Sequence, residues 1–281
     1  MESSITEHMD PVLLIALVFV GLFAGIMGAL FGIGGGMIIV PILTIGLGMA
    51  AKDAAAISLV GIVATSVGAS SVYVGRGISN IRLGLFLEIG TVIGAIVGVF
   101  IAIYISNFVL TIVFSAVTVY AGYRMLAEPE KKVMPTDDQG KYNMKYFDET
   151  DKKYVGYNVR NLGKGAAISS VAGVIASMTG MGGGTIKVPV MNMYMGVPMK
   201  VATATSNYMI GITAFAGAIL YFILGEIDLM FAGTVAVGGF IGSMIGTRIS
   251  PHIDGKALRK YFAVLLFIVA VIMVLNAGGC L

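Results

Sequence analysis

The sequence is poor in charge and almost free of cysteine. Only 12% of its 281 residues are charged, and Cys280 is the single cysteine. Soluble domains carry roughly 25% charged residues, so this composition argues against a water-facing surface, and low charge also argues against disorder. One cysteine excludes a scaffold held by disulfide bonds, and a net charge of +3 is too small to indicate binding to nucleic acid.

Catalytic and metal-binding patterns are also missing. The chain has no H-E-x-x-H, no G-x-S-x-G and no His/Cys spacing typical of a metal site, and His8 and His252 stand alone. The glycine runs lack the βαβ surroundings of a dinucleotide fingerprint. We therefore expect no enzyme, no metal and no cofactor.

Hydrophobic residues make up 57% of the chain, and they occur in long runs. Residues 11–51 contain no charge; as a single helix they would measure about 60 Å, twice the hydrocarbon thickness of a bilayer. The run must therefore break, and Gly34, Gly35 and Gly36 are the poorest helix formers in it. The sequence predicts a glycine-broken helical hairpin here, although residues 12–31 are long enough to span alone.

The rest of the chain divides at a charged segment. Residues 127–164 hold 8 Lys/Arg and 7 Asp/Glu, which predicts a water-exposed linker. It separates a first transmembrane repeat, 11–126, from a second, 165–281, and an N-terminal tail covers 1–10. The expected spans are 54–75, 83–105, 108–123, 201–224, 229–247 and 261–275, with a second glycine-broken stretch at 165–199. The fold class is an all-α polytopic membrane protein in a lipid bilayer.

The two halves repeat each other. At an offset of 148, residues 25–101 match residues 173–249 at 22 of 77 positions. The densest block is G-x-G-G-G-x-x-x-x-P, at 32–41 and again at 180–189. A second block carries glycines four residues apart, which predicts one helix face that another helix can approach closely. Its members are Gly90, Gly94 and Gly98, with Gly238, Gly242 and Gly246.

Lysine and arginine predict the orientation of the halves. If each glycine-broken stretch returns to its own side and the N-terminus is outside, 16 of the 18 basic residues fall on the inner side with the linker. Four crossings per half would place 248–260 outside, so we expect two inverted repeats, each with a broken hairpin and three transmembrane helices. Both termini are then outside and the linker is cytoplasmic. Without a basic n-region, we expect no cleavable signal peptide.

Opposed broken helices predict a site for an anion. The first amides of a helix lack intrahelical partners and carry the positive end of its dipole, and glycine lets a ligand reach them directly. The candidate residues are Gly34, Gly35, Gly36, Gly182, Gly183, Gly184 and Thr185. The alternative is that these glycines only bend a tightly packed hairpin.

Lys187 follows the second break, where the first half has Ile39. A lysine within the membrane is costly and normally has a partner or a task. Three interpretations stay open: Lys187 faces the substrate, forms a structural pair with Glu88, or extends toward the membrane surface. Glu88 is accordingly a candidate for coupling or for a salt bridge.

Polar side chains gather in the span after each hairpin. Ser58, Thr205, Ser206 and Asn207 are candidates for neutral hydrogen-bond donors to an oxyanion. The commoner use of such residues within a span is to bond their own backbone or a neighbouring helix.

With its two G-x-G-G-G-x-x-x-x-P elements, paired polar spans and long central linker, the sequence resembles the TauE/SafE family of permeases, often called sulfite exporters. The resemblance implies a secondary transporter in the cell inner membrane that moves small sulfur-containing anions such as sulfite or organosulfonates, commonly outward. An anion channel with the same polar lining is the alternative, and an intramembrane enzyme or a receptor acting through the linker are more distant ones. The oligomeric state is not indicated.

Overall fold

The computed structural model describes residues 11–127, 143–148, 153–250 and 255–278. The predicted outer tail 1–10, the isolated His8 and His252, and Cys280 lie outside these residues. So do 128–142 and 149–152 of the linker.

Eight helices in the described ranges are long and apolar enough to cross a bilayer, which confirms an all-α polytopic membrane fold. Six of them lie at the six predicted spans to within a few residues, except that the last helix begins at 255 and not at 261. The other two are the long helices of the glycine-broken stretches, and the second of these begins at 162, inside the predicted linker. The eight helices are α1 (Pro11–Phe31), α3 (Ala51–Gly75), α4 (Ile81–Tyr104), α5 (Asn107–Ala127), α6 (Leu162–Thr179), α8 (Met199–Ile223), α9 (Leu229–Ile249) and α10 (Gly255–Ala277).

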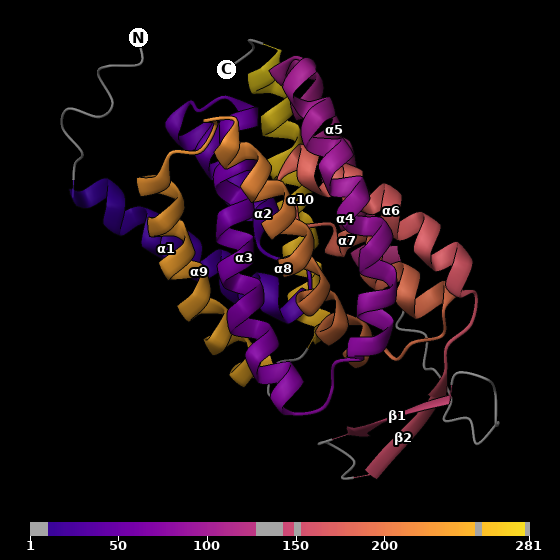
Figure 1. Cartoon of the computed structure of the whole chain (residues 1–281). Coiled ribbons are helices and arrows are strands. Elements are labelled where there is room, and N and C mark those ends of the chain that lie inside the picture. The colour runs from indigo at the N-terminus through magenta and orange to yellow at the C-terminus, as the bar shows by residue number, and fades with distance from the viewer. Residues whose placement is uncertain (1–10, 128–142, 149–152, 251–254, 279–281) are drawn as a thin grey trace.

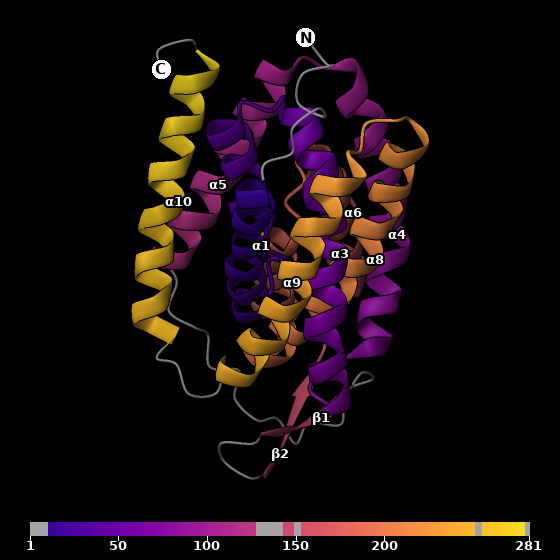
Figure 2. The same ribbon diagram turned by 90° about the vertical axis from the view of Figure 1, so that its left-hand side faces the viewer.

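The order of elements in the first half recurs in the second. A long helix, a six-residue helix, a five-residue π segment and three long helices follow one another in each half. The long helices pair across the halves: α1 packs along α9, and its counterpart α6 packs along α4. The last helices of the halves, α5 and α10, lie side by side at one edge of the bundle (Figure 2).

The glycine breaks have the same geometry in both halves. After α1 the chain turns into α2 (Gly36–Pro41) and the π segment η1 (Ile42–Gly46); after α6 it turns into α7 (Gly184–Pro189) and η2 (Val190–Tyr194). Each combined segment has 11 residues, or about 16 Å of helix, roughly half the hydrocarbon thickness. Each glycine-broken stretch thus consists of one helix long enough to span and one short helix that is not.

Three glycines in each break have a positive φ, a backbone conformation that residues with a Cβ rarely adopt. The prolines that close the six-residue helices lack an N–H, and the helix changes to π geometry directly after each of them. The glycines are Gly32, Gly34 and Gly35, with φ of 71°, 82° and 86°, and Gly180, Gly182 and Gly183, with φ of 72°, 79° and 73°.

The spaced glycines allow close helix packing, as predicted. A Cβ on Gly94 or Gly98 of α4 would overlap the backbone of α6 at Ser170 or Val174. The glycines of α9 meet the backbone of α1 in the same way. Backbones this close gain dispersion contacts that do not depend on water, which is how helices associate within a bilayer.

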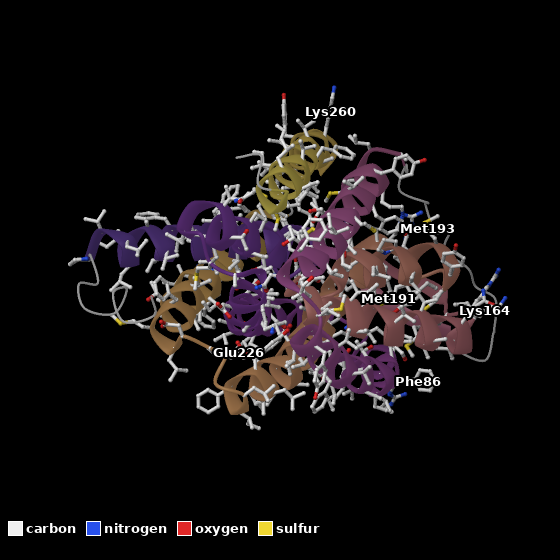
Figure 3. The ribbon with its side chains drawn as sticks, turned by 90° about the horizontal axis from the view of Figure 1, so that it is seen from above. Phe86, Lys164, Met191, Met193, Glu226 and Lys260 are labelled. Atoms are coloured by element: carbon white, nitrogen blue, oxygen red, sulfur yellow. The ribbon has the colours of Figure 1, made fainter. Side chains whose placement is uncertain are left out.

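The outer surface of the bundle is apolar. Figure 3 contrasts Phe86, which points away from α4 and is 50% exposed, with the fully buried Met191. Large apolar side chains such as Phe19 on α1 and Ile89 on α4 are likewise exposed. Such a surface is unfavourable in water and suited to lipid.

The described part of the linker contains a two-stranded antiparallel sheet that the sequence did not predict. Strands β1 (Asn143–Asp148) and β2 (Lys153–Asn158) lie at the opposite end of the bundle from the C-terminal end of α10 (Figure 1). Tyr157 is buried on the bundle, and its hydroxyl accepts a 2.8 Å hydrogen bond from Asn80 Nδ2. Burial raises the pKa of Tyr157 to about 12. The sheet is therefore docked between the α3–α4 turn and η2, where Arg160 N also donates to Met195 O.

Candidate functional site

The two glycine breaks touch each other in the interior. A Cβ on Gly36 would overlap the carbonyl oxygen of Gly180, and one on Gly184 would overlap that of Gly32. Each first residue of a short helix thus abuts the break of the other half. The predicted convergence of the breaks is present, and only glycine permits so close an approach.

Two equivalent serines hold the breaks in place. Ser58 Oγ on α3 donates a 2.8 Å hydrogen bond to Gly180 O, and Ser206 Oγ on α8 donates one of 2.9 Å to Gly32 O. Each serine therefore bonds the break of the opposite half. In this conformation both candidate ligands have a structural use, which is the commoner role of serine within a span.

An apolar side chain from each half covers the breaks on one face. Gly34 and Gly182 both face Ile62 of α3 and Ile210 of α8, which are fully buried. Ile62 and Ile210 are again equivalent positions at the offset of 148. The breaks are closed on this face.

Lys187 lies in a buried cluster with Glu88 and Thr213. Its Nζ is 3.3 Å from Glu88 Oε2 and donates a 2.8 Å hydrogen bond to Thr213 Oγ1. The Thr213 hydroxyl also bonds Glu88 Oε1. Lys187 is 0% and Glu88 3% exposed. The cluster joins α7 to α4 and α8, and in this conformation Lys187 faces a carboxylate.

A cavity of about 110 Å³ reaches the second break. Gly184 and Thr185 line it at the start of α7, and Asn192 and Thr203 line it farther along. Ile186 N is the first amide of α7 with an intrahelical partner, Gly183 O, so the amides of Gly184 and Thr185 precede the bonded turn. Thr185 Oγ1 is buried and finds no hydrogen-bond partner in the described part of the chain.

A second cavity of about 290 Å³ lies at the other end of α5. Asn107 and Thr111 at the start of α5 line it, whereas Ala121 and Arg124 at the end of α5 line the first cavity. Along α2 and η1, Met37 lines the first cavity and Thr44 the second. The side chains between them, Ile38, Ile39, Val40, Pro41 and Leu43, are buried, whereas Ile42 is partly exposed. A short apolar barrier therefore separates the cavities.

The remaining candidates lie at different places. Asn207 Nδ2 donates to Ala29 O and Thr203 O, next to the first break, and its buried Oδ1 has no partner among the described residues. Thr205 Oγ1 accepts from Asn80 N at the α3–α4 turn, away from the breaks. The structure thus brings the two glycine breaks, Ser58, Ser206 and Asn207 together, with Lys187 and Glu88 in an adjoining cluster.

Arg124 is a residue of the site that the sequence did not indicate. Arg124 lines the cavity that reaches Thr185, whereas from the sequence it counts only among the 16 basic residues on the inner side. No periodicity shows that the end of α5 lies beside η2. The one available signal was a basic residue directly after the predicted span 108–123, which the structure places in the last turn of α5.

The fold and this interior define a class: a polytopic membrane protein in which two glycine-broken helices meet beside a cavity, a plan that secondary transporters share. Comparison with known proteins makes this specific. The family model described as sulfite exporter TauE/SafE matches residues 17–273, so the chain belongs to this family. It is a membrane transporter.

The chain is similar over most of its length to two prokaryotic proteins. It is 24% identical to the probable membrane transporter protein YunE of Bacillus subtilis, over 91% of this chain and 95% of that protein. It is 26% identical to a probable membrane transporter protein of Methanocaldococcus jannaschii, over 94% and 96%. A shorter match, 28% identical over 38% of this chain, is to the Sulfite exporter TauE/SafE family protein 1 of Arabidopsis thaliana. No solved structure matches the chain significantly.

Proposed function

We propose that this protein is a secondary transporter of small sulfur-containing anions such as sulfite or organosulfonates, and that it binds them where the two glycine breaks meet. The site comprises the break glycines, Thr185 and Lys187, with Ser58, Ser206 and Asn207 as polar neighbours. Thr205, which bonds Asn80 at the α3–α4 turn, lies outside this site. The observation that carries the proposal is the direct contact of the breaks, with a cavity that ends at Gly184 and Thr185.

The positions of the cavities support alternating access. One cavity reaches a break from the Arg124 end of α5, while the other stops at Thr44 on the far side of the apolar barrier. An anion channel would need a continuous polar path. A carrier needs a site open to one side at a time, which fits this arrangement.

We further propose how the protein is oriented in the cell inner membrane. Residues 11–126 and 165–281 form inverted repeats, the 127–164 linker is cytoplasmic, and both termini, including the tail 1–10, are outside. Support comes from the lysine and arginine distribution and from the reciprocal contacts of the two halves. The cavity that reaches Thr185 is then open to the cytoplasm. A membrane potential, negative inside, favours anion export by about 2.3 kcal/mol per charge per 100 mV.

Cysteine labelling tests whether the cavity that reaches Thr185 is open to the cytoplasm. In a Cys280→Ser background, Thr203→Cys is expected to react with an impermeant maleimide only from the linker side. Asn276→Cys, which lines the other cavity, is the matched control and is expected to react only from the opposite side. A transported anion at saturating concentration is expected to slow labelling of Thr203→Cys.

Sealed right-side-out and inside-out vesicles provide the measurement. Labelling of both positions from both sides, together with single-channel currents, would indicate a channel. Labelling of Thr203→Cys only from outside the cell would reverse the proposed orientation.

A further inference from the structure

Lys187 and Glu88 are the two charged side chains that are buried among the described residues. Both oxygens of the Glu88 carboxylate are in use: Oε2 lies 3.3 Å from Lys187 Nζ, and Oε1 accepts a hydrogen bond from the Thr213 hydroxyl. Lys187 Nζ donates to the same hydroxyl at 2.8 Å. Within the described part of the chain, each charge thus has the other as its counterion. The proposed anion site uses Lys187 and leaves Glu88 without a task.

The equivalent place in the other half is built without charge. At the offset of 148, Lys187 corresponds to Ile39, Glu88 to Ala236 and Thr213 to Thr65. Ile39 is fully buried, so the same arrangement of helices packs with an aliphatic side chain where the second half has its lysine. A buried ion pair is often no more stabilising than apolar residues of similar size. The pair in the second half therefore calls for a use other than stability.

Lys187 also lies against the second break. Its Cε is 3.7 Å from the position that a Cβ on Gly183 would take, and its backbone N donates to Gly183 O. Gly184 and Thr185, which line the cavity, belong to the same short helix. An anion bound at these residues and the Glu88 carboxylate therefore compete for one buried cation.

The charge of the cluster is balanced only while Glu88 keeps its cation. In the empty site, the charges of Lys187 and Glu88 sum to zero. An anion that pairs with Lys187 leaves the Glu88 carboxylate without a counterion, in an interior where the side chain is 3% exposed. An isolated buried carboxylate is so unfavourable that it binds a proton instead. The occupied site, with the anion, Lys187 and a protonated Glu88, then again has no net charge for a monovalent anion.

The other titratable groups on the surrounding helices lie away from Glu88. Its helix, α4, packs against α6 and α8 and more weakly against α3, and α7 carries Lys187 as its one titratable residue. The remaining charged residues of the four long helices are exposed or partly exposed in the first turn of each helix: Arg82, Lys164, Lys200, Lys52 and Asp53. Their tyrosines have other neighbours: Tyr208 packs beside Gly84, Tyr221 donates to Ser177 O, Tyr73 donates to Ala29 O, and Tyr104 is exposed. Glu88 is thus the group among them that is placed to take up a proton beside Lys187.

We propose that Glu88 is a proton-binding site that couples anion transport to protons. When the anion takes Lys187 as its counterion, the Glu88 carboxylate forms an O–H bond with one proton from the water on the open side. After the anion leaves on the other side, that bond breaks, the proton returns to water there, and the salt bridge forms again. Each anion thus moves with one proton in the same direction.

The inference rests on the proposed function, because it needs the anion at Lys187. It also sets which gradient drives the anion. A monovalent anion that moves with one proton carries no net charge across the bilayer, so its distribution follows the pH gradient. A divalent anion still carries one net negative charge, which the membrane potential drives outward.

Proteoliposomes that contain the purified full chain test the coupling. Ethanesulfonate is the probe, because a sulfonate stays ionised over the pH range used. With the membrane potential held at zero by potassium and valinomycin, an outside that is more acidic by about one pH unit is expected to drive uptake to about tenfold accumulation. A pH-sensitive dye inside is expected to report one proton entering with each anion. At equal pH, a membrane potential is expected to leave the accumulation unchanged.

Glu88→Gln removes the proton-binding carboxylate and keeps a polar partner for Thr213. This variant is expected to lose the roughly tenfold accumulation and to distribute ethanesulfonate according to the membrane potential. Glu226→Gln is the matched control, because Glu226 is a partly exposed carboxylate in the turn after α8 and is labelled in Figure 3. The control is expected to keep the coupling.

The measurement on the unaltered chain decides the inference, even if Glu88→Gln does not fold. Ethanesulfonate that follows the membrane potential and not the pH gradient would overturn the coupling and leave the proposed function standing. Unchanged coupling in folded Glu88→Gln would overturn the role of Glu88 in the same way. If the unaltered chain moves neither ethanesulfonate nor sulfite, the proposed function fails and the inference fails with it.

Discussion

Replacing Gly184 with alanine is expected to reduce anion transport by about 100-fold. The added methyl group would overlap Gly32 O, so the two breaks must move apart. A shift of about 1 Å at a site of this kind is enough for a loss of that size. Proteoliposome flux of sulfite and ethanesulfonate provides the measurement.

Gly233→Ala is the matched control for this substitution. Gly233 lies in α9, is exposed, and has open space where its Cβ would be. Alanine there also favours the helix by about 1 kcal/mol relative to glycine. The control is expected to transport normally. Normal transport by folded Gly184→Ala would mean that contact between the breaks is not needed for function.

Breaking the buried pair is expected to have the second large effect. In Lys187→Met, the Glu88 carboxylate loses its cation in a site that water does not reach. Removing one partner of a buried pair typically costs about 3–5 kcal/mol, so we expect a marked loss of thermal stability and of most anion flux. Lys164→Met, an exposed lysine on α6 labelled in Figure 3, is the control and is expected to change neither.

A double variant separates folding from transport. Lys187→Met with Glu88→Gln removes both charges and leaves a neutral partner for Thr213, so stability is expected to recover. Transport is expected to remain low, because the proposed anion site includes the charge of Lys187. A double variant that regains stability and transports normally would make the pair purely structural.

The sequence predicted the helices and the glycine breaks because both are local patterns. Uncharged runs longer than a bilayer must break, and the break lies where the worst helix formers gather. The repeat of G-x-G-G-G-x-x-x-x-P then made two equivalent breaks foreseeable. Close packing through Gly94 and Gly98 followed from their spacing in the same way.

The partners of individual polar residues could not be predicted in this way. Lys187 and Glu88 are 99 positions apart, and they meet only because α4 and α7 both pack against α6 and α8. Arg124 and Met193 likewise meet because the end of α5 lies beside η2. The docked β1–β2 sheet was not predicted because the high charge of the linker indicated only exposure to water. Tyr157 is buried through a long-range contact with Asn80 that no local pattern shows.

A density map of the protein in lipid nanodiscs, saturated with a transported organosulfonate, tests most directly whether the anion binds where the breaks meet. The account predicts density for the sulfonate group within hydrogen-bond distance of the Gly184 and Thr185 amides. Density confined to places remote from both breaks, in a protein that transports the same compound, would contradict it.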